Sequence, residues 1–188
     1  MMVYLARAER RRSIVEAAAA VVARDGLSAV TARTVAEELG GSQGQIHHHF
    51  SSTDELVAEA WCAYSTSEIE AYEQEVRGLE PIDAVTEFFG DLLGGTDGRA
   101  MARWAEAAAH AQLRNSVVAD SYVASLARLT DVLADVLCRR GGDTADARNA
   151  AGRLLMLAVG LAGIVRITDS PPIPVSSVML SAIHSESR

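Results

Sequence analysis

Apolar residues recur every three or four positions along most of the chain, and the recurring segments are separated by glycine or proline. This spacing places side chains on one face of a helix, whereas a strand would need strict alternation. The pattern therefore predicts an all-α protein. The two stripes of the first 50 residues are Ile14, Ala18, Val21 and Val22, then Val35, Ala36 and Leu39.

Two short helices joined by a tight turn are predicted between Thr31 and Phe50. Thr31 is a favoured N-cap for the first helix. Gly40 and Gly41 can adopt the left-handed backbone that ends a helix, and Ser42 is placed to cap the next one. The segment therefore reads as a helix-turn-helix.

The second of these helices has two different faces. Ile46, His49 and Phe50 fall on one side, and the residues that point away from it are Gly44, Gln45, His47 and His48. An outward face of glutamine and histidine suits the DNA major groove, because these side chains can bond base edges or phosphates. A helical hairpin that binds no ligand has the same spacing, so this alternative stays open.

Longer helices are predicted in the rest of the chain. Their approximate ranges are 9–24, 53–77, 81–93, 100–113, 116–140, 144–168 and 176–183. Residues 154–165 are apolar on all sides, and a helix of this kind must be covered on all sides. We therefore expect a two-fold dimer in which the helices over 116–140 and 144–168 of each copy form a four-helix interface.

Charge is distributed unevenly around a net charge of −8. Residues 1–50 have a balance of +1 and residues 51–188 a balance of −9, so the acidic part is expected to stay off DNA. Between Asp54 and Asp91 there are eleven acids and one arginine. Such a run is usually a solvated face; the alternative is a preference of this region for cationic ligands.

Several classes of protein find no support in the sequence. Three histidines in a row point in three directions on a helix and make a poor metal site. There is no phosphate loop, nucleophile elbow or Cys/His cluster. The longest apolar run is shorter than the ~20 residues of a membrane span, and no secretory signal is recognised. We therefore expect a cytoplasmic protein that is not an enzyme, uses no metal or cofactor and binds no membrane.

Residues 11–56, RRSIVEAAAAVVARDGLSAVTARTVAEELGGSQGQIHHHFSSTDEL, resemble the DNA-binding domain of TetR-family transcriptional repressors. The shared features are an alanine-rich first helix, a threonine that opens the second, a Gly-x-Ser turn, and a third helix that ends in His-Phe. His47 replaces the family's usual tyrosine, and Thr53 replaces its usual lysine. The resemblance implies DNA contacts from Thr31, Arg33, Ser42, Gln43, Gly44, Gln45, His47, His48 and Thr53.

The resemblance also implies the organisation of the whole chain. Residues 1–52 would form the three-helix DNA-binding domain, and residues 53–188 a helical bundle for ligand binding and dimerisation. The partners would be a palindromic double-stranded operator, a second copy of the chain and a small-molecule effector that releases the repressor. A dimeric helical protein-interaction module that does not bind DNA is the alternative.

Large or polar-tipped residues of the middle helices are the candidates for the effector pocket, although residues of this kind are more often plain core. They are Trp61, Tyr64, Phe88, Phe89, Met101, Trp104, His110, Tyr122 and Met156. Residues 103–115, followed by two long helices, also resemble the C-terminal domain of the family's choline-responsive repressors. Choline is not assigned as the ligand on this ground.

Overall fold

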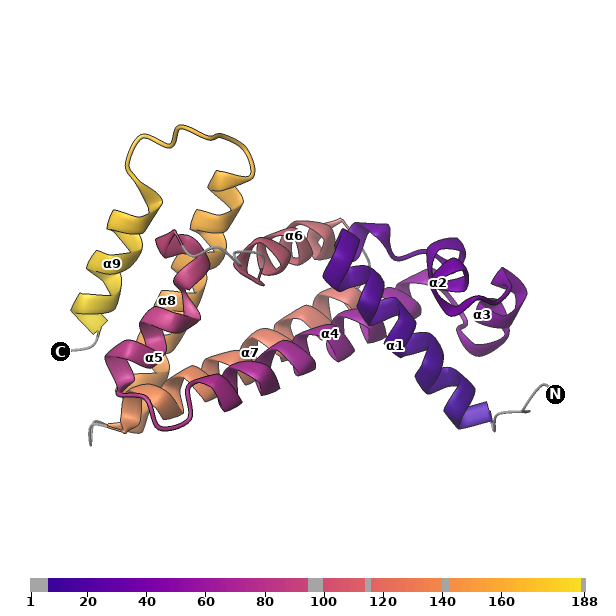
Figure 1. The fold of residues 1–188 in the computed structure, drawn as a ribbon, viewed down its shortest axis with the longest axis horizontal. Helices are drawn as coiled ribbons and strands as arrows, with labels where there is room; N and C mark the ends of the chain where they lie inside the picture. The colour runs from indigo at the N-terminus through magenta and orange to yellow at the C-terminus, as the bar shows by residue number, and fades with distance from the viewer. Residues whose placement is uncertain (1–6, 95–99, 114–115, 140–142, 187–188) are drawn as a thin grey trace. The chain divides into compact units, whose positions relative to one another are not determined.

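The computed structural model describes residues 7–94, 100–113, 116–139 and 143–186 (Figure 1). Its described residues form helices and connecting segments without a strand, so the predicted all-α class is confirmed. The α-helices are α1 (Arg7–Asp25), α2 (Ala32–Leu39), α3 (Gln43–His49), α4 (Thr53–Glu75), α5 (Pro81–Phe88), α6 (Ala100–Gln112), α7 (Ser116–Cys138), α8 (Thr144–Val165) and α9 (Val175–Glu186). Two short 3₁₀ helices, η1 (Leu27–Ala29) and η2 (Gly90–Leu93), complete the set.

Most predicted helices are present with ends shifted by a few residues. The segment opened by Pro81 differs, because α5 ends at Phe88 and the chain continues as η2 rather than as one longer helix. The 3₁₀ helix η1 was not predicted. Arg140, the predicted end of the helix over 116–140, lies outside the described residues.

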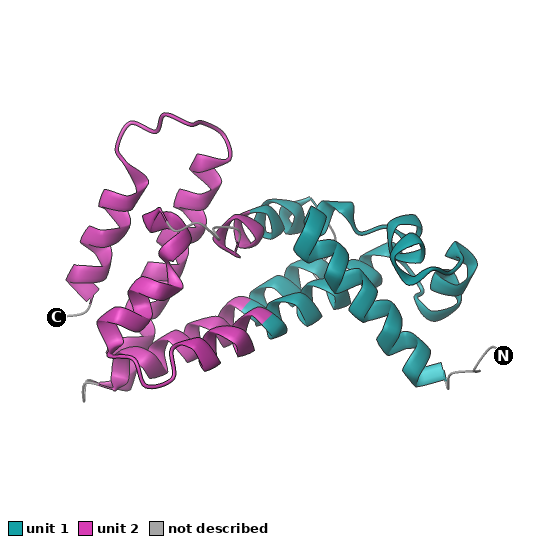
Figure 2. Ribbon diagram, in the orientation of Figure 1, with its two compact units in different colours: residues 1–67, 106–125 teal, residues 68–105, 126–188 magenta. Residues whose placement is uncertain are grey.

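The chain divides into two compact units, shown in different colours in Figure 2. Unit 1 comprises residues 1–67 and 106–125, and unit 2 comprises residues 68–105 and 126–188. This division differs from the predicted boundary after residue 52. The first two-thirds of α4 pack with the N-terminal helices, because Leu56, Val57 and Trp61 are buried there.

Unit 1 is built on α1, which packs on α2 and η1, while α2 packs on α3. The predicted α1 stripe is fully buried, with Ile14, Ala18, Val21 and Val22 all at 0% exposure. Gly26 follows α1 with φ +92°, a conformation that glycine adopts without steric strain. A Cβ at this position would also meet the carboxylate of Glu106, so the turn into η1 requires glycine.

Unit 2 contains a second core around α5, η2, α8 and α9, in which α9 packs on α8 and on η2. Asp143 caps α8 by accepting bonds from the amides of Ala145 (2.7 Å) and Asp146 (3.2 Å). One side of α8 is buried, including Leu154, Leu155 and Ala158. By length and composition α8 is the one described helix that could cross a membrane, yet this buried side is that of a core helix.

Candidate functional site

The helix-turn-helix of unit 1 is fixed by the caps of its helices. Thr31 and Thr34 form a reciprocal capping box, in which the Thr34 amide donates to Thr31 Oγ1 (3.1 Å) and the Thr31 amide donates to Thr34 Oγ1 (3.0 Å). Gly40 ends α2 in the left-handed conformation, with φ 66°. The predicted cap and stop of α2 are therefore confirmed, and the turn leads directly into α3.

Ser42 is the residue before α3, as predicted, but its side chain makes no capping bond. The helix is instead held from its inner side, where Ile46 and Phe50 are both buried. Because these two residues anchor α3, its opposite side, from Gln43 to Gln45 and at His47 and His48, is exposed and available to a partner.

The residues predicted to contact DNA are all exposed, both on α3 and at the starts of α2 and α4. They are Thr31, Arg33, Ser42, Gln43, Gly44, Gln45, His47, His48 and Thr53. Arg33 is 75% exposed in its side chain and pairs with Glu37 on the same helix (2.9 Å). This surface has the donors and acceptors that base edges and phosphates require, and contact with DNA remains a prediction.

His49 differs from its two neighbours because it turns toward the protein. Its Nδ1 is buried and has no hydrogen-bond partner in the structure. Burial lowers the pKa of His49, and the nearby His48, Arg7, Arg11 and Arg10 lower it further. His47 and His48 remain exposed, and the described residues contain no group of three or more side chains that could hold a metal ion.

Arg11 lies on α1 and has an internal role. Its guanidinium donates to Glu55 (2.6 Å) and to Glu59, and it lies over the Phe50 ring at 4.3 Å from the centroid. Glu55 also accepts from the amide and hydroxyl of Ser51, both at 2.7 Å. These contacts connect α1 and the end of α3 to α4. Arg11 therefore positions the helix-turn-helix, and its guanidinium is already engaged within the protein and not available to bind a DNA phosphate.

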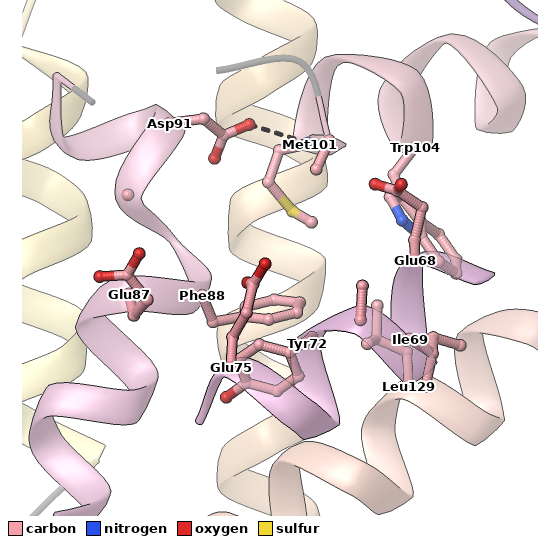
Figure 3. A pocket seen from close by; sticks show the side chains of 13 residues that line it. Glu68, Ile69, Tyr72, Glu75, Glu87, Phe88, Asp91, Met101, Trp104 and Leu129 are labelled. Carbon is pink, nitrogen blue, oxygen red and sulfur yellow. Dashed lines mark hydrogen bonds between the residues drawn. The ribbon is translucent and has the colours of Figure 1, made fainter. Parts of the chain in front are cut away.

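Unit 2 contains a cavity of about 410 Å³, shown in Figure 3. Residues from α4, α5, η2, α6 and α7 contribute to its wall. The lining residues are Glu68, Ile69, Ala71, Tyr72, Glu75, Glu87, Phe88, Gly90, Asp91, Ala100, Met101, Trp104 and Leu129. A cavity of this size and mixed apolar and polar lining is typical of small-molecule sites.

Three of the predicted pocket residues, Phe88, Met101 and Trp104, line this cavity. They lie on two separate helices, α5 and α6. All three residues belong to unit 2, the unit that contains the cavity.

The other predicted pocket residues do not line this cavity. Trp61 packs against Tyr64 and Tyr122 inside unit 1, with ring centroids 5.7 Å apart in each pair. His110 also belongs to unit 1. Aromatic side chains that find apolar neighbours become core, and sequence spacing does not separate this outcome from a pocket.

Within unit 2, Phe89 and Met156 are also absent from the cavity wall. Phe89 is fully buried and packs edge-on against Phe88, with centroids 4.7 Å apart. Met156 is 65% exposed on the outer side of α8. Adjacent residues of a helix point in different directions, so the stripe that contains Phe88 and Phe89 could not specify which of them faces the cavity.

The sequence-based set did not include Tyr72 or the four acidic residues of the cavity wall, Glu68, Glu75, Glu87 and Asp91. The run of acidic residues between Asp54 and Asp91 was a signal in the sequence for these carboxylates. Tyr72 is buried, donates from its hydroxyl to the Ala84 carbonyl (3.2 Å), and has a pKa raised by burial. Asp91 accepts from the Met101 amide through Oδ2 (2.8 Å). Burial also raises the pKa of Asp91.

Comparisons with known proteins agree with this geometry. Residues 14–60 match the family model for bacterial regulatory proteins of the tetR family. Over 84 residues the chain is 30% identical to the HTH-type nicotine-responsive transcriptional repressor HdnoR of Paenarthrobacter nicotinovorans, covering 45% of this chain and 43% of that protein. The chain spans less than half the length of the curated relatives it matches.

Solved structures extend the likeness to nearly the whole chain. A crystal structure from Rhodococcus sp., assigned to the TetR family, has a TM-score of 0.69 at 24% identity and covers 96% of this chain and 100% of its own. A transcriptional regulator from Saccharomonospora viridis in complex with choline has a TM-score of 0.65 at 25% identity, covering 95% of each chain. Residues 14–60 thus form a helix-turn-helix domain of the tetR family of bacterial regulatory proteins, and the chain as a whole shares the fold of TetR-family transcriptional regulators.

Proposed function

We propose that this protein is a cytoplasmic transcriptional repressor that binds a palindromic DNA operator as a homodimer. It leaves the operator when a small molecule occupies the cavity of unit 2. The observation that carries the proposal is the outward face of α3, where Gln43, Gln45, His47 and His48 are exposed while Ile46 anchors the helix from behind. In a helix-turn-helix protein the second helix enters the major groove, with its early residues nearest the bases.

Selection of DNA fragments by the purified full-length chain tests the DNA-binding part. The expected result is enrichment of one sequence with two inverted half-sites about 34 Å apart, one helical turn of DNA, or a multiple of this. Gel shifts with the enriched fragment and a scrambled fragment then measure the specificity. Enrichment of unrelated sequences, or equal binding of both fragments, would point to the protein-interaction module instead.

The proposed dimer uses an apolar face on α8 and α9. The sequence assigned the interface to residues 116–140 and 144–168, but Val118, Leu129 and Leu133 of α7 are buried within the chain. Met156 and Leu180 are exposed on α8 and α9. The two helices pack on each other, and exposed apolar residues on neighbouring helices are typical of an interface between subunits, so we propose that α8 and α9 form the interface.

Light scattering of variants tests the dimer. Leu180→Glu places a charge in the proposed interface and should give a monomer that binds its operator weakly. Val123→Glu is the matched control, because Val123 is an exposed apolar residue of α7 in unit 1. A dimer that survives Leu180→Glu but not Val123→Glu would move the interface away from α8 and α9.

Two observations support release of the operator by a ligand: α4 and α6 each contribute to both units, and similar proteins respond to or bind small molecules. The cavity wall includes residues of α4 and α6, and both helices also contribute residues to unit 1. One relative is described as nicotine-responsive, and one similar structure contains choline. A ligand that favours one arrangement of these helices shifts the population of DNA-binding molecules. Gel shifts with and without cavity-binding compounds test this; compounds that bind without changing operator affinity would contradict it.

A further inference from the structure

The cavity of unit 2 is lined by side chains of one charge sign. Four carboxylates contribute to its wall, those of Glu68, Glu75, Glu87 and Asp91, and the described lining residues include no arginine or histidine. Like charges inside a partly enclosed site repel an anionic ligand and attract a cation, because the protein screens them less than water does. The charge of the wall thus favours a positively charged occupant.

Asp91 gives this preference a specific location. Its Oδ2 accepts a bond from the Met101 amide, but its Oδ1 is buried and has no hydrogen-bond partner in the structure. A buried acceptor without a partner is destabilising, and a charged donor that reaches it would recover this free energy. A ligand cation beside Asp91 would provide such a donor or counter-charge.

The remainder of the wall is aromatic and apolar. Tyr72 and Phe88 pack edge to face with ring centroids 4.5 Å apart, and Trp104 lies on another part of the wall. Figure 3 shows the labelled carboxylates distributed around these rings. The face of an aromatic ring attracts ammonium groups, including quaternary ammonium groups that cannot donate hydrogen bonds. The rings therefore complement the carboxylates.

A metal ion is a poorer occupant than an organic cation. Ca²⁺ and Mg²⁺ need several oxygen ligands converging at about 2.0–2.6 Å, and no group of three or more possible ligands converges in the described part of the chain. The volume of about 410 Å³ is also in the range of organic ligands. We infer that the cavity selects an organic cation with an apolar or aromatic body, an amine or quaternary ammonium compound, as the effector; this inference rests on the proposed function.

Two pairs of probes test the selection, each a quaternary ammonium compound and the uncharged molecule of the same shape with carbon in place of nitrogen. The pairs are benzyltrimethylammonium with neopentylbenzene, and choline with 3,3-dimethylbutan-1-ol. Calorimetry with the full-length protein without DNA should show that the cation of at least one pair binds about tenfold more tightly than its uncharged partner. Equal or tighter binding of the uncharged partner in both pairs, or absence of binding by both cations, would overturn the inference.

Charge-neutral variants show where the cation binds. Glu75→Gln and Asp91→Asn keep the size and an oxygen acceptor, and each should weaken binding of the cation about tenfold while leaving the uncharged partner unchanged. Glu73→Gln is the matched control, because it removes the same charge from an exposed position of α4 outside the cavity wall. Equal weakening by Glu73→Gln would mean that the net charge, and not this cavity, attracts the cation.

Gel shifts with the selected operator separate this inference from the proposed function. If the cation binds with the expected dependence on Glu75 and Asp91 but does not change operator affinity, the ligand class is supported and ligand-controlled release is wrong. If the uncharged compound of a pair both binds better and releases the operator, release is supported and cation selection is wrong.

Discussion

The outward face of α3 and the cavity of unit 2 are proposed to bind different partners, DNA and a small molecule, and they are built in opposite ways. The first comes from one short continuous segment whose side chains need only be left exposed. The second comes from residues 68 to 129, carried on several helices that must fold before the cavity exists. DNA offers a surface to be read from outside, whereas a small ligand must be enclosed to be bound with useful affinity.

This difference implies that the two surfaces should respond differently to substitution. Exposed residues of α3 can change without affecting stability, since they make few contacts within the chain. Cavity residues contribute to folding and binding together, because Tyr72, Met101 and Trp104 are buried. Substitutions of the exposed residues of α3 are therefore expected to change DNA binding without changing stability, whereas substitutions of buried residues should change stability.

The largest effect is expected from removing the anchor of α3. Ile46 is 1% exposed, and Ile46→Ala should lower the free energy of unfolding by about 2–5 kcal/mol, because it removes buried methylene groups and leaves a cavity. Chemical denaturation measures the loss. Val123→Ala is the control, because Val123 is 62% exposed on α7, away from the proposed interface, and it should change the stability little. Equal stability of Ile46→Ala and the unchanged protein would contradict the assigned packing of α3.

Removal of an outward glutamine should affect DNA binding alone. Gln45→Ala should weaken operator binding by about 1–3 kcal/mol, the usual value of a bidentate contact to a base edge. Its melting temperature should not change, because Gln45 is exposed. Quantitative gel shifts make the measurement, with Gln74→Ala on the exposed surface of α4 as the control. If both variants bind the operator as tightly as the unchanged protein, Gln45 does not read DNA.

The two arginines Arg11 and Arg33 should have separable roles. Arg33→Gln should reduce the slope of log affinity against log salt by about 0.9, the value for one lost phosphate contact. Arg11→Gln should leave the slope unchanged and lower the free energy of unfolding by about 1 kcal/mol, because it removes the contacts to Glu55, Glu59 and Phe50. Gel shifts at several salt concentrations and thermal denaturation distinguish the two variants; a reduced slope for Arg11→Gln would show that Arg11 also contacts a phosphate.

The smallest effect concerns Glu55, whose pKa is lowered below 4.5, first by the hydrogen bonds from Ser51 and then by Arg11. A carboxylate with a lowered folded-state pKa stabilises the protein above its ordinary pKa, and this stabilisation is lost as the pH falls through the lowered value. Glu55→Gln should therefore be less stable at pH 7 by less than about 1 kcal/mol, and the difference should shrink as the pH falls below the ordinary carboxyl pKa and disappear below the lowered pKa of Glu55.

Denaturation at several pH values checks this last expectation. Glu16→Gln, at an exposed position of α1, is the control and should change stability little at either end of the range. A difference for Glu55→Gln that is as large in acid as at neutral pH would show that its ionised form is not what holds Ser51 and Arg11.

The sequence by itself determined the α-helices of the first 50 residues, including the helix-turn-helix, because their signals are local. The Thr31 cap, the Gly40 stop and the apolar spacing that buries Ile46 all act within a few residues of chain. The same periodicity determines which side chains of α3 face away from the protein. The residues predicted to contact DNA are therefore all exposed. The resemblance of residues 11–56 to the DNA-binding domain of TetR-family repressors then indicated the family, which the helix signals alone do not give.

Only the tertiary structure decided which aromatic residues enclose a cavity and which become core. Trp61 and Trp104 have the same chemistry and both are buried on helices, but Trp61 packs against Tyr64 and Tyr122 while Trp104 lines the cavity. The packing of helices distant in sequence likewise brings Glu68 and Asp91 to one wall and gives Arg11 its carboxylate partners. Burial and pairing are properties of the surroundings of a residue, and in this protein those surroundings come from segments that periodicity alone cannot bring together.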